Sequence, residues 1–75
     1  MKLEDFIKNF ANQFDDTDES EITAETVYTE LDEWSSLTVL SIIAMVKTDF
    51  GKEITAKQIR SCDTIEDLYN LVNSL

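Results

Sequence analysis

The chain has 75 residues, enough for one domain with a modest core, and its sixteen acidic and six basic residues give a net charge of −10. A surface this acidic repels nucleic-acid phosphates and anionic lipids, so we expect neither as a partner and favour a basic protein instead. With no histidine, one cysteine and one glycine, the chain lacks the residues for a histidine-based triad, a usual structural zinc site, an internal disulfide or a glycine-rich phosphate loop, which favours a carrier or binding role over catalysis.

A first helix is predicted from Lys2 to Phe14, because apolar residues recur there at the spacing of one helix face. We expect Phe6, Phe10 and Phe14 from this stripe to lie in the core. Residues 15–35 lose the periodicity and hold nine of the sixteen acidic residues. We interpret them as a long loop held against the core, with a helical turn near Ala24 to Tyr28. The predicted anchors of this loop are Ile22, Val27, Tyr28, Leu31 and Trp34.

A second helix is predicted from Ser36 to Phe50, ending at Gly51, where a left-handed stop favours a residue without Cβ. Its apolar residues are expected to form an inner stripe with a wider apolar margin. The stripe is Leu37, Leu40, Ile43, Ala44 and Phe50, and the margin is Val39, Ile42 and Val46.

A short helix is expected over Ala56 to Ser61, and Thr64 opens a last helix with a Thr-x-x-acid cap. No segment alternates long enough to suggest a strand. We therefore predict one all-α domain over residues 1–75, a small four-helix bundle of three main helices and one short helix, with a long first loop. No apolar stretch approaches the ~20 residues of a membrane span, so we expect a soluble, cytoplasmic monomer without membrane insertion.

The segment Trp34-Ser35-Ser36-Leu37 resembles the acyl carrier protein family. In that family an Asp-Ser-Leu tripeptide starts the second helix and its serine bears a 4′-phosphopantetheine arm; the matching tripeptide here is Ser35-Ser36-Leu37. The family pattern overlays without a gap from Ser36 to about Leu68. Upstream, Tyr28 and Leu31 match the loop anchors, with one extra residue between Leu31 and Ser36. The resemblance therefore covers nearly the whole chain and implies an acyl-carrier-like fold.

The resemblance implies a non-catalytic carrier that holds acyl groups as thioesters on a 4′-phosphopantetheine attached to Ser36. A phosphopantetheinyl transferase would load the arm from coenzyme A, and acyl-transferring or condensing enzymes with basic patches would be the other partners. Fatty-acid, modified-lipid and secondary-metabolite synthesis are the candidate pathways. An anion on a serine at a helix start would also lie at the positive end of the helix dipole, a placement worth roughly 0.3–1 kcal/mol.

Three alternatives compete with this interpretation. Ser36 or its neighbour Ser35 would serve only as a helix cap, the cargo would be aminoacyl or peptidyl, or the chain would be an unmodified acidic module that docks on a basic protein. Cys62 is expected to be a buried, inert thiol.

Two departures from the family pattern suggest dedicated partner enzymes rather than the common set. Ser35 stands where the family most often has Asp, and the helix face that is acidic in the family reads Thr38, Ser41 and Lys47 here. Trp34 is expected to be a buried loop anchor, with partner docking as the alternative. The predicted partner-recognition residues are Trp34, Ser35, Leu37, Thr38 and Ser41.

Overall fold

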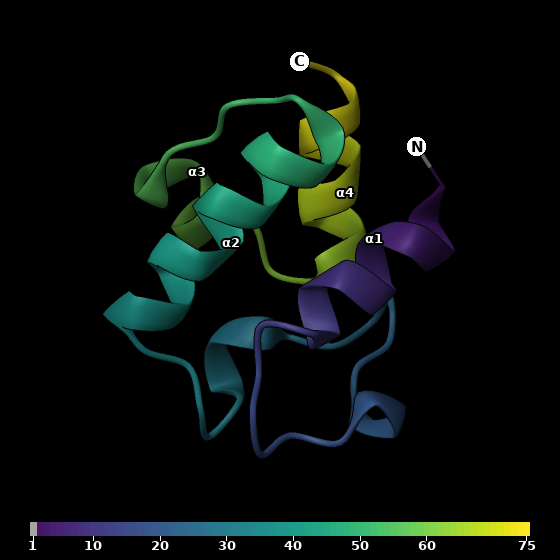
Figure 1. The fold of residues 1–75 in the computed structure, drawn as a ribbon, viewed down its shortest axis with the longest axis vertical. Helices are drawn as coiled ribbons and strands as arrows, with labels where there is room; N and C mark the ends of the chain where they lie inside the picture. The colour runs from purple at the N-terminus through teal and green to yellow at the C-terminus, as the bar shows by residue number, and fades with distance from the viewer. Residues whose placement is uncertain (1) are drawn as a thin grey trace.

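The computed structural model describes residues 2–75, which form a small all-α bundle around one core (Figure 1). Its helices are α1 (Leu3–Ala11), α2 (Ser36–Phe50), α3 (Ala56–Ser61) and α4 (Ile65–Asn73), with 3₁₀ turns η1 (Glu19–Glu21) and η2 (Tyr28–Glu30) in the long connection before α2. Within residues 2–75 the extended pairing is limited to an isolated bridge between Val27 and Thr64. The predicted fold class, three longer helices and one short one, is therefore confirmed.

Helix α1 ends earlier than predicted. It stops at Ala11, and two turn bonds follow, from the Gln13 N–H to the Phe10 carbonyl and from the Phe14 N–H to the Ala11 carbonyl, each 3.1 Å. These shorter i→i+3 bonds tighten the chain beyond the helix end. They still carry the Phe14 side chain into the core, where it is buried like Phe6 and Phe10. The predicted core role of the three phenylalanines is confirmed.

The long connection is pinned at Tyr28. Its side chain is fully buried, and its hydroxyl donates to the carbonyls of Ile59 and Cys62 (3.1 Å to Cys62). Burial, and secondarily the proximity of Cys62, Asp63 and Asp67, raises the pKa of Tyr28, so the hydroxyl stays protonated and available as a donor. Ile22 is also buried, whereas Val27 is more than a third exposed and does not anchor the loop as predicted.

The helical turn predicted near Ala24 to Tyr28 forms later in the chain, as η2, because part of the backbone before it pairs with α4. The carbonyls of Ala24 and Thr26 accept from the N–H groups of Glu66 and Ile65, at 3.0 and 3.2 Å. Those donors belong to the first turn of α4, which has no acceptors of its own within the helix. Residues 24–25 lie in a turn closed by the Thr26 N–H and the Thr23 carbonyl at 3.1 Å, and η2 begins only at Tyr28.

The buried face of α2 also differs from the prediction. Val39, Ile42, Met45 and Val46 face the core, with Ile43 and Phe50 half-buried beside them. Three residues of the predicted inner stripe are exposed instead: Leu37, Leu40 and Ala44. Apolar residues lie on almost every side of this helix, so their spacing alone does not select one face.

The end of α2 and the start of α4 agree with the sequence-based expectations. Gly51 ends α2 in the left-handed region, with φ of 68°. Thr64 caps α4 in a reciprocal capping box with Asp67, and Thr55 forms the same motif with Gln58 at α3.

Candidate functional site

The start of α2 separates two neighbouring serines into two roles. Ser35 is the N-cap: its backbone is extended, and its Oγ accepts from the Thr38 N–H at 3.4 Å. Ser36 is the first residue of the helix and is exposed. Because the Ser35 side chain caps the helix, the Ser36 hydroxyl is not needed to accept from a backbone N–H and is exposed to solvent.

Glu33 ties the start of α2 to the far end of the long connection. Its carboxylate accepts from the N–H groups of Asp15 (3.3 Å) and Asp16 (2.9 Å) and from the Thr17 hydroxyl (2.5 Å). The Thr17 bond is the main reason why the pKa of Glu33 lies below its ordinary value, with the backbone N–H groups adding to it. The sequence analysis did not identify Glu33 as a site residue. Its hydrogen-bond partners lie 16–18 residues away in the chain, so no short sequence motif indicates them.

Thr38 belongs to the support of the site rather than to its surface. It is 8% exposed, and its hydroxyl donates to the Glu33 carbonyl at 2.9 Å and lies 3.3 Å from the Ser35 Oγ. Its predicted place on the exposed docking face of α2 is therefore wrong. The reason is that its hydroxyl satisfies a backbone carbonyl that the turn before the helix leaves unpaired.

Trp34 packs as a loop anchor immediately before the cap. Its ring stacks on Phe10, with centroids 6.5 Å apart and an interplanar angle of 6°, and lies 5.0 Å from the Tyr28 ring. The side chain is half-buried. Tethers on both sides of Ser35, at Trp34 and at Thr38, thus hold the backbone around Ser36.

The exposed residues beside Ser36 are apolar. Leu37 is 75% exposed and Leu40 is 61% exposed, while Ser41 is half-buried. No charged residue occurs between Ser36 and Val46. Of the predicted partner-recognition residues, Ser35 and Leu37 are exposed. Trp34 and Ser41 are half-buried, and Thr38 is buried.

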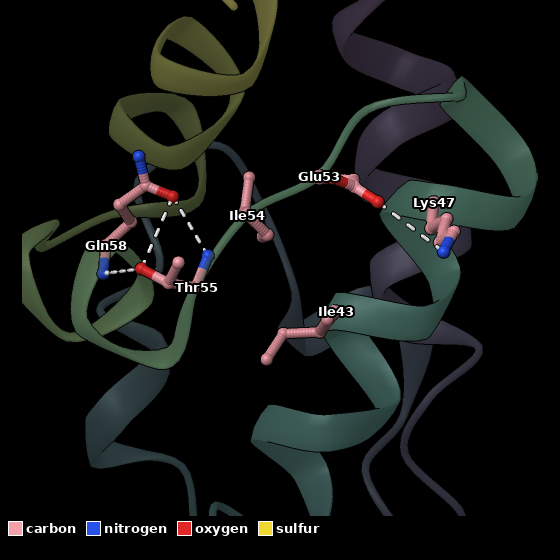
Figure 2. A pocket seen from close by; sticks show the side chains of 6 residues that line it. All are labelled: Ile43, Lys47, Glu53, Ile54, Thr55 and Gln58. Atoms are coloured by element: carbon pink, nitrogen blue, oxygen red, sulfur yellow. Dashed lines mark hydrogen bonds and ion pairs between the residues drawn. The ribbon is translucent and has the colours of Figure 1, made fainter.

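A pocket of about 470 Å³ opens between α2, α3 and the connection that joins them (Figure 2). Its lining residues are Ile43, Lys47, Glu53, Ile54, Thr55 and Gln58. Ile43 and Ile54 supply the apolar part, and Lys47 pairs with Glu53 at 3.5 Å across one side. Ile43 lies seven residues after Ser36 on nearly the same side of α2, which is about 10 Å along the helix axis.

Cys62 is partly buried, on the core side of the turn between α3 and α4. Burial raises the pKa of its thiol, which disfavours the reactive thiolate. This environment is consistent with the inert thiol that was predicted.

No family model, curated protein or solved structure matched the chain when it was compared with each of these. Among residues 2–75, no helix is long and apolar enough to cross a membrane. The functional interpretation accordingly depends on the residues around Ser36 and on their geometry.

Proposed function

We propose that this chain is an acyl carrier protein that bears a 4′-phosphopantetheine arm on Ser36 and carries acyl intermediates as thioesters for other enzymes. The observation that carries the proposal is the arrangement at the start of α2, where Ser35 is the N-cap and Ser36, the first residue of the helix, is exposed. The resemblance of Ser35-Ser36-Leu37 and of the pattern that follows to the acyl carrier family agrees with it.

The residues around Ser36 fit a covalent phosphodiester. The Thr38 N–H is taken by Ser35 and the Val39 N–H by the Ser35 carbonyl. The N–H groups of Ser36 and Leu37, in contrast, have no acceptor within the helix. They lie at the positive end of α2, which stabilises an anion on Ser36 by roughly 0.3–1 kcal/mol.

In this proposal the protein supplies a rigid anchor and the cofactor supplies the reactive group. The arm, once attached, contributes a terminal thiol that forms thioesters with the cargo. Glu33, Trp34 and Thr38 hold the backbone on which Ser36 stands. The pocket beside Ile43 supports a cargo that is partly apolar, since two isoleucines and several polar groups line it. Fatty-acid, modified-lipid and secondary-metabolite pathways all use cargo of this kind.

A second candidate function is an unmodified module that docks on a basic protein. The net charge of −10 and the exposed Leu37 and Leu40 favour it. An aminoacyl or peptidyl carrier is a variant of the first proposal and has the same requirement for Ser36.

Loading by a promiscuous phosphopantetheinyl transferase distinguishes a carrier from an unmodified module. The chain is incubated with the transferase and coenzyme A, and its intact mass is measured. We expect a gain of one phosphopantetheine in the wild type, no gain in Ser36→Ala and a retained gain in Ser35→Ala. Ser35→Ala removes a cap, at about 1 kcal/mol, so circular dichroism should show that it is still folded.

A transferase that loads a control carrier but leaves the wild-type chain unchanged would rule out the carrier and leave the docking module. A gain that persists in Ser36→Ala would place the arm on another residue.

A further inference from the structure

Glu33 joins two stretches that are far apart in the chain, at the turn that leads into α2. Its carboxylate accepts from the Asp15 N–H at 3.3 Å, the Asp16 N–H at 2.9 Å and the Thr17 hydroxyl at 2.5 Å. Figure 1 shows the stretch after α1 and the stretch before α2 side by side below the helices. Three donors on one carboxylate therefore hold these stretches together.

The backbone carbonyl of Glu33 continues the network into α2. It accepts the Thr38 hydroxyl at 2.9 Å, and the same Thr38 oxygen lies 3.3 Å from the Ser35 Oγ. Thr38 gives its hydroxyl hydrogen to Glu33, so in the contact with Ser35 it is the Ser35 hydroxyl that donates. Hydrogen bonds thus run from the end of the first stretch through Glu33 to the cap of α2. We call this set the Glu33 network: Asp15, Asp16, Thr17, Glu33, Ser35 and Thr38.

Ser36 is the next residue in the chain after this network. The backbone before it is not helical: Asp32 and Glu33 form a turn, and Ser35 is extended. A helical ladder does not fix such a backbone, so side-chain contacts have to do so. The Glu33 network supplies such contacts on both sides of the turn, and it therefore helps to set the path of the chain into Ser36.

Loading of Ser36 needs an oriented hydroxyl. In the proposed reaction with coenzyme A, the Ser36 Oγ forms a bond to the phosphorus that carries the pantetheine. The bond from that phosphorus to the bridging oxygen of the pyrophosphate breaks, adenosine bisphosphate leaves with the electron pair, and the serine proton passes to a base of the transferase. The attacking and leaving oxygens must lie roughly in line, so a small displacement of the serine slows the chemical step.

We propose that Glu33 is a positioning residue for this reaction: by holding residues 15–17 against the turn before α2, it fixes the backbone from which Ser36 reaches the transferase. The proposal rests on the proposed function of Ser36 and adds a residue on which the reactivity of that serine depends. Glu33 lies three residues before Ser36 and acts through the backbone. Because it orients the serine and does not bind the transferase, its loss lowers kcat and leaves KM for the chain unchanged.

The test measures kcat and KM for loading of the full chain by a phosphopantetheinyl transferase with coenzyme A. Glu33→Ala removes the acceptors of the carboxylate, whereas Glu33→Gln keeps one oxygen that accepts. We expect kcat to fall about tenfold in Glu33→Ala and less in Glu33→Gln, with KM within about twofold of wild type in both.

Two controls separate positioning from charge and from stability. Glu30→Gln removes the same charge at an exposed glutamate of η2, and Gly51→Ala strains the opposite end of α2 without touching the Glu33 network. Both should keep kcat and KM within about twofold of wild type. The assays are run at a temperature at which circular dichroism shows that every variant is folded.

Thr38→Val tests whether the network acts as one unit. It removes the hydroxyl that the Glu33 carbonyl accepts and keeps a side chain of nearly the same shape. We expect kcat to fall in Thr38→Val, and the double variant with Glu33→Ala to lose less than the product of the two single losses, because members of one hydrogen-bond network are coupled. Thr38→Ser, which keeps the hydroxyl, should restore most of the kcat. Losses that simply multiply would contradict a shared network.

Four further outcomes would overturn the proposal. A wild-type kcat in Glu33→Ala would show that Ser36 does not depend on Glu33, and would leave the carrier function standing. A loss confined to KM, equal in Glu33→Ala and Glu33→Gln, would show that the transferase recognises the charge of Glu33. A similar fall of kcat in Gly51→Ala would assign the effect to stability. A wild type that no transferase loads would remove the carrier function itself, and the positioning role with it.

Discussion

Glu33 is the residue that holds the long connection against the start of α2. Its carboxylate receives three donors from residues 15–17, and its own carbonyl receives the Thr38 hydroxyl. One side chain thus links the segment after α1 to the turn that presents Ser36. The sequence shows Glu33 only as one of many acids before the helix, and its role depends on partners that the fold brings to it.

Glu33→Gln should make stability less dependent on pH. The pKa of Glu33 is lowered in the folded protein, mainly by the Thr17 hydroxyl. The ionised carboxylate therefore stabilises the fold above the unfolded pKa, and this contribution is lost as pH falls through the folded pKa. We expect Glu33→Gln to melt below wild type at about pH 7, with a difference that shrinks as the pH is lowered below the ordinary pKa of a glutamate.

Thermal melts followed by circular dichroism over this pH range measure the effect. Glu30→Gln, at an exposed glutamate of η2, is the matched control because it removes the same charge. Equal shifts in the two variants, or a Glu33→Gln difference that does not change with pH, would contradict the role assigned to Glu33.

At the scale of elements, α2 combines a well-defined start and end with an ambiguous middle. Ser35 and Gly51 set its limits through local chemistry, a side-chain cap and a left-handed stop. The middle is apolar almost all round, so packing against α1 and α3 selects the buried face. That selection leaves Leu37 and Leu40 outside, next to Ser36.

Gly51→Ala should destabilise the protein through its backbone alone. A Cβ at this position would meet nothing within 4 Å, so the penalty is the left-handed φ of 68°. We expect a loss of about 1–2 kcal/mol, a large part of the ~3–5 kcal/mol typical of a domain this small. Urea unfolding measures the loss. Gly51→Asn is the control, since asparagine tolerates this region better; it should lose less, and equal losses in the two variants would contradict the explanation.

At the scale of the whole molecule, the negative charge is poorly balanced. The chain has sixteen acidic residues for six basic ones, and the pair between Lys47 and Glu53 is exposed. The molecule measures 29 × 24 × 21 Å, while the screening length at 0.1 M salt is about 10 Å. At low salt, repulsion between acidic side chains therefore acts across much of the protein. At moderate salt it is screened over a distance shorter than the protein's width.

Added sodium chloride should raise the melting temperature at neutral pH, because it screens this repulsion. The measurement is a series of thermal melts up to about 0.2 M salt. The control is the same series near the isoelectric point, where the net charge and hence the salt effect should vanish. A melting temperature that stays level or falls at neutral pH would argue against self-repulsion as a term in the stability of this protein.

The sequence by itself determined the order of the helices, the limits of α2 and α3, the threonine cap of α4, the stop at Gly51 and the position of Ser36 at a helix start. These features depend on residues within a few positions of one another, so spacing and capping chemistry report them. Only the tertiary structure decided which face of α2 is buried, where the 3₁₀ turns lie and what Glu33 and Thr38 contact. The hydrogen-bond partners of Glu33 lie far away in the chain, and the backbone before α2 bonds to the distant start of α4. The buried face of α2 is selected by packing, because several of its sides are apolar.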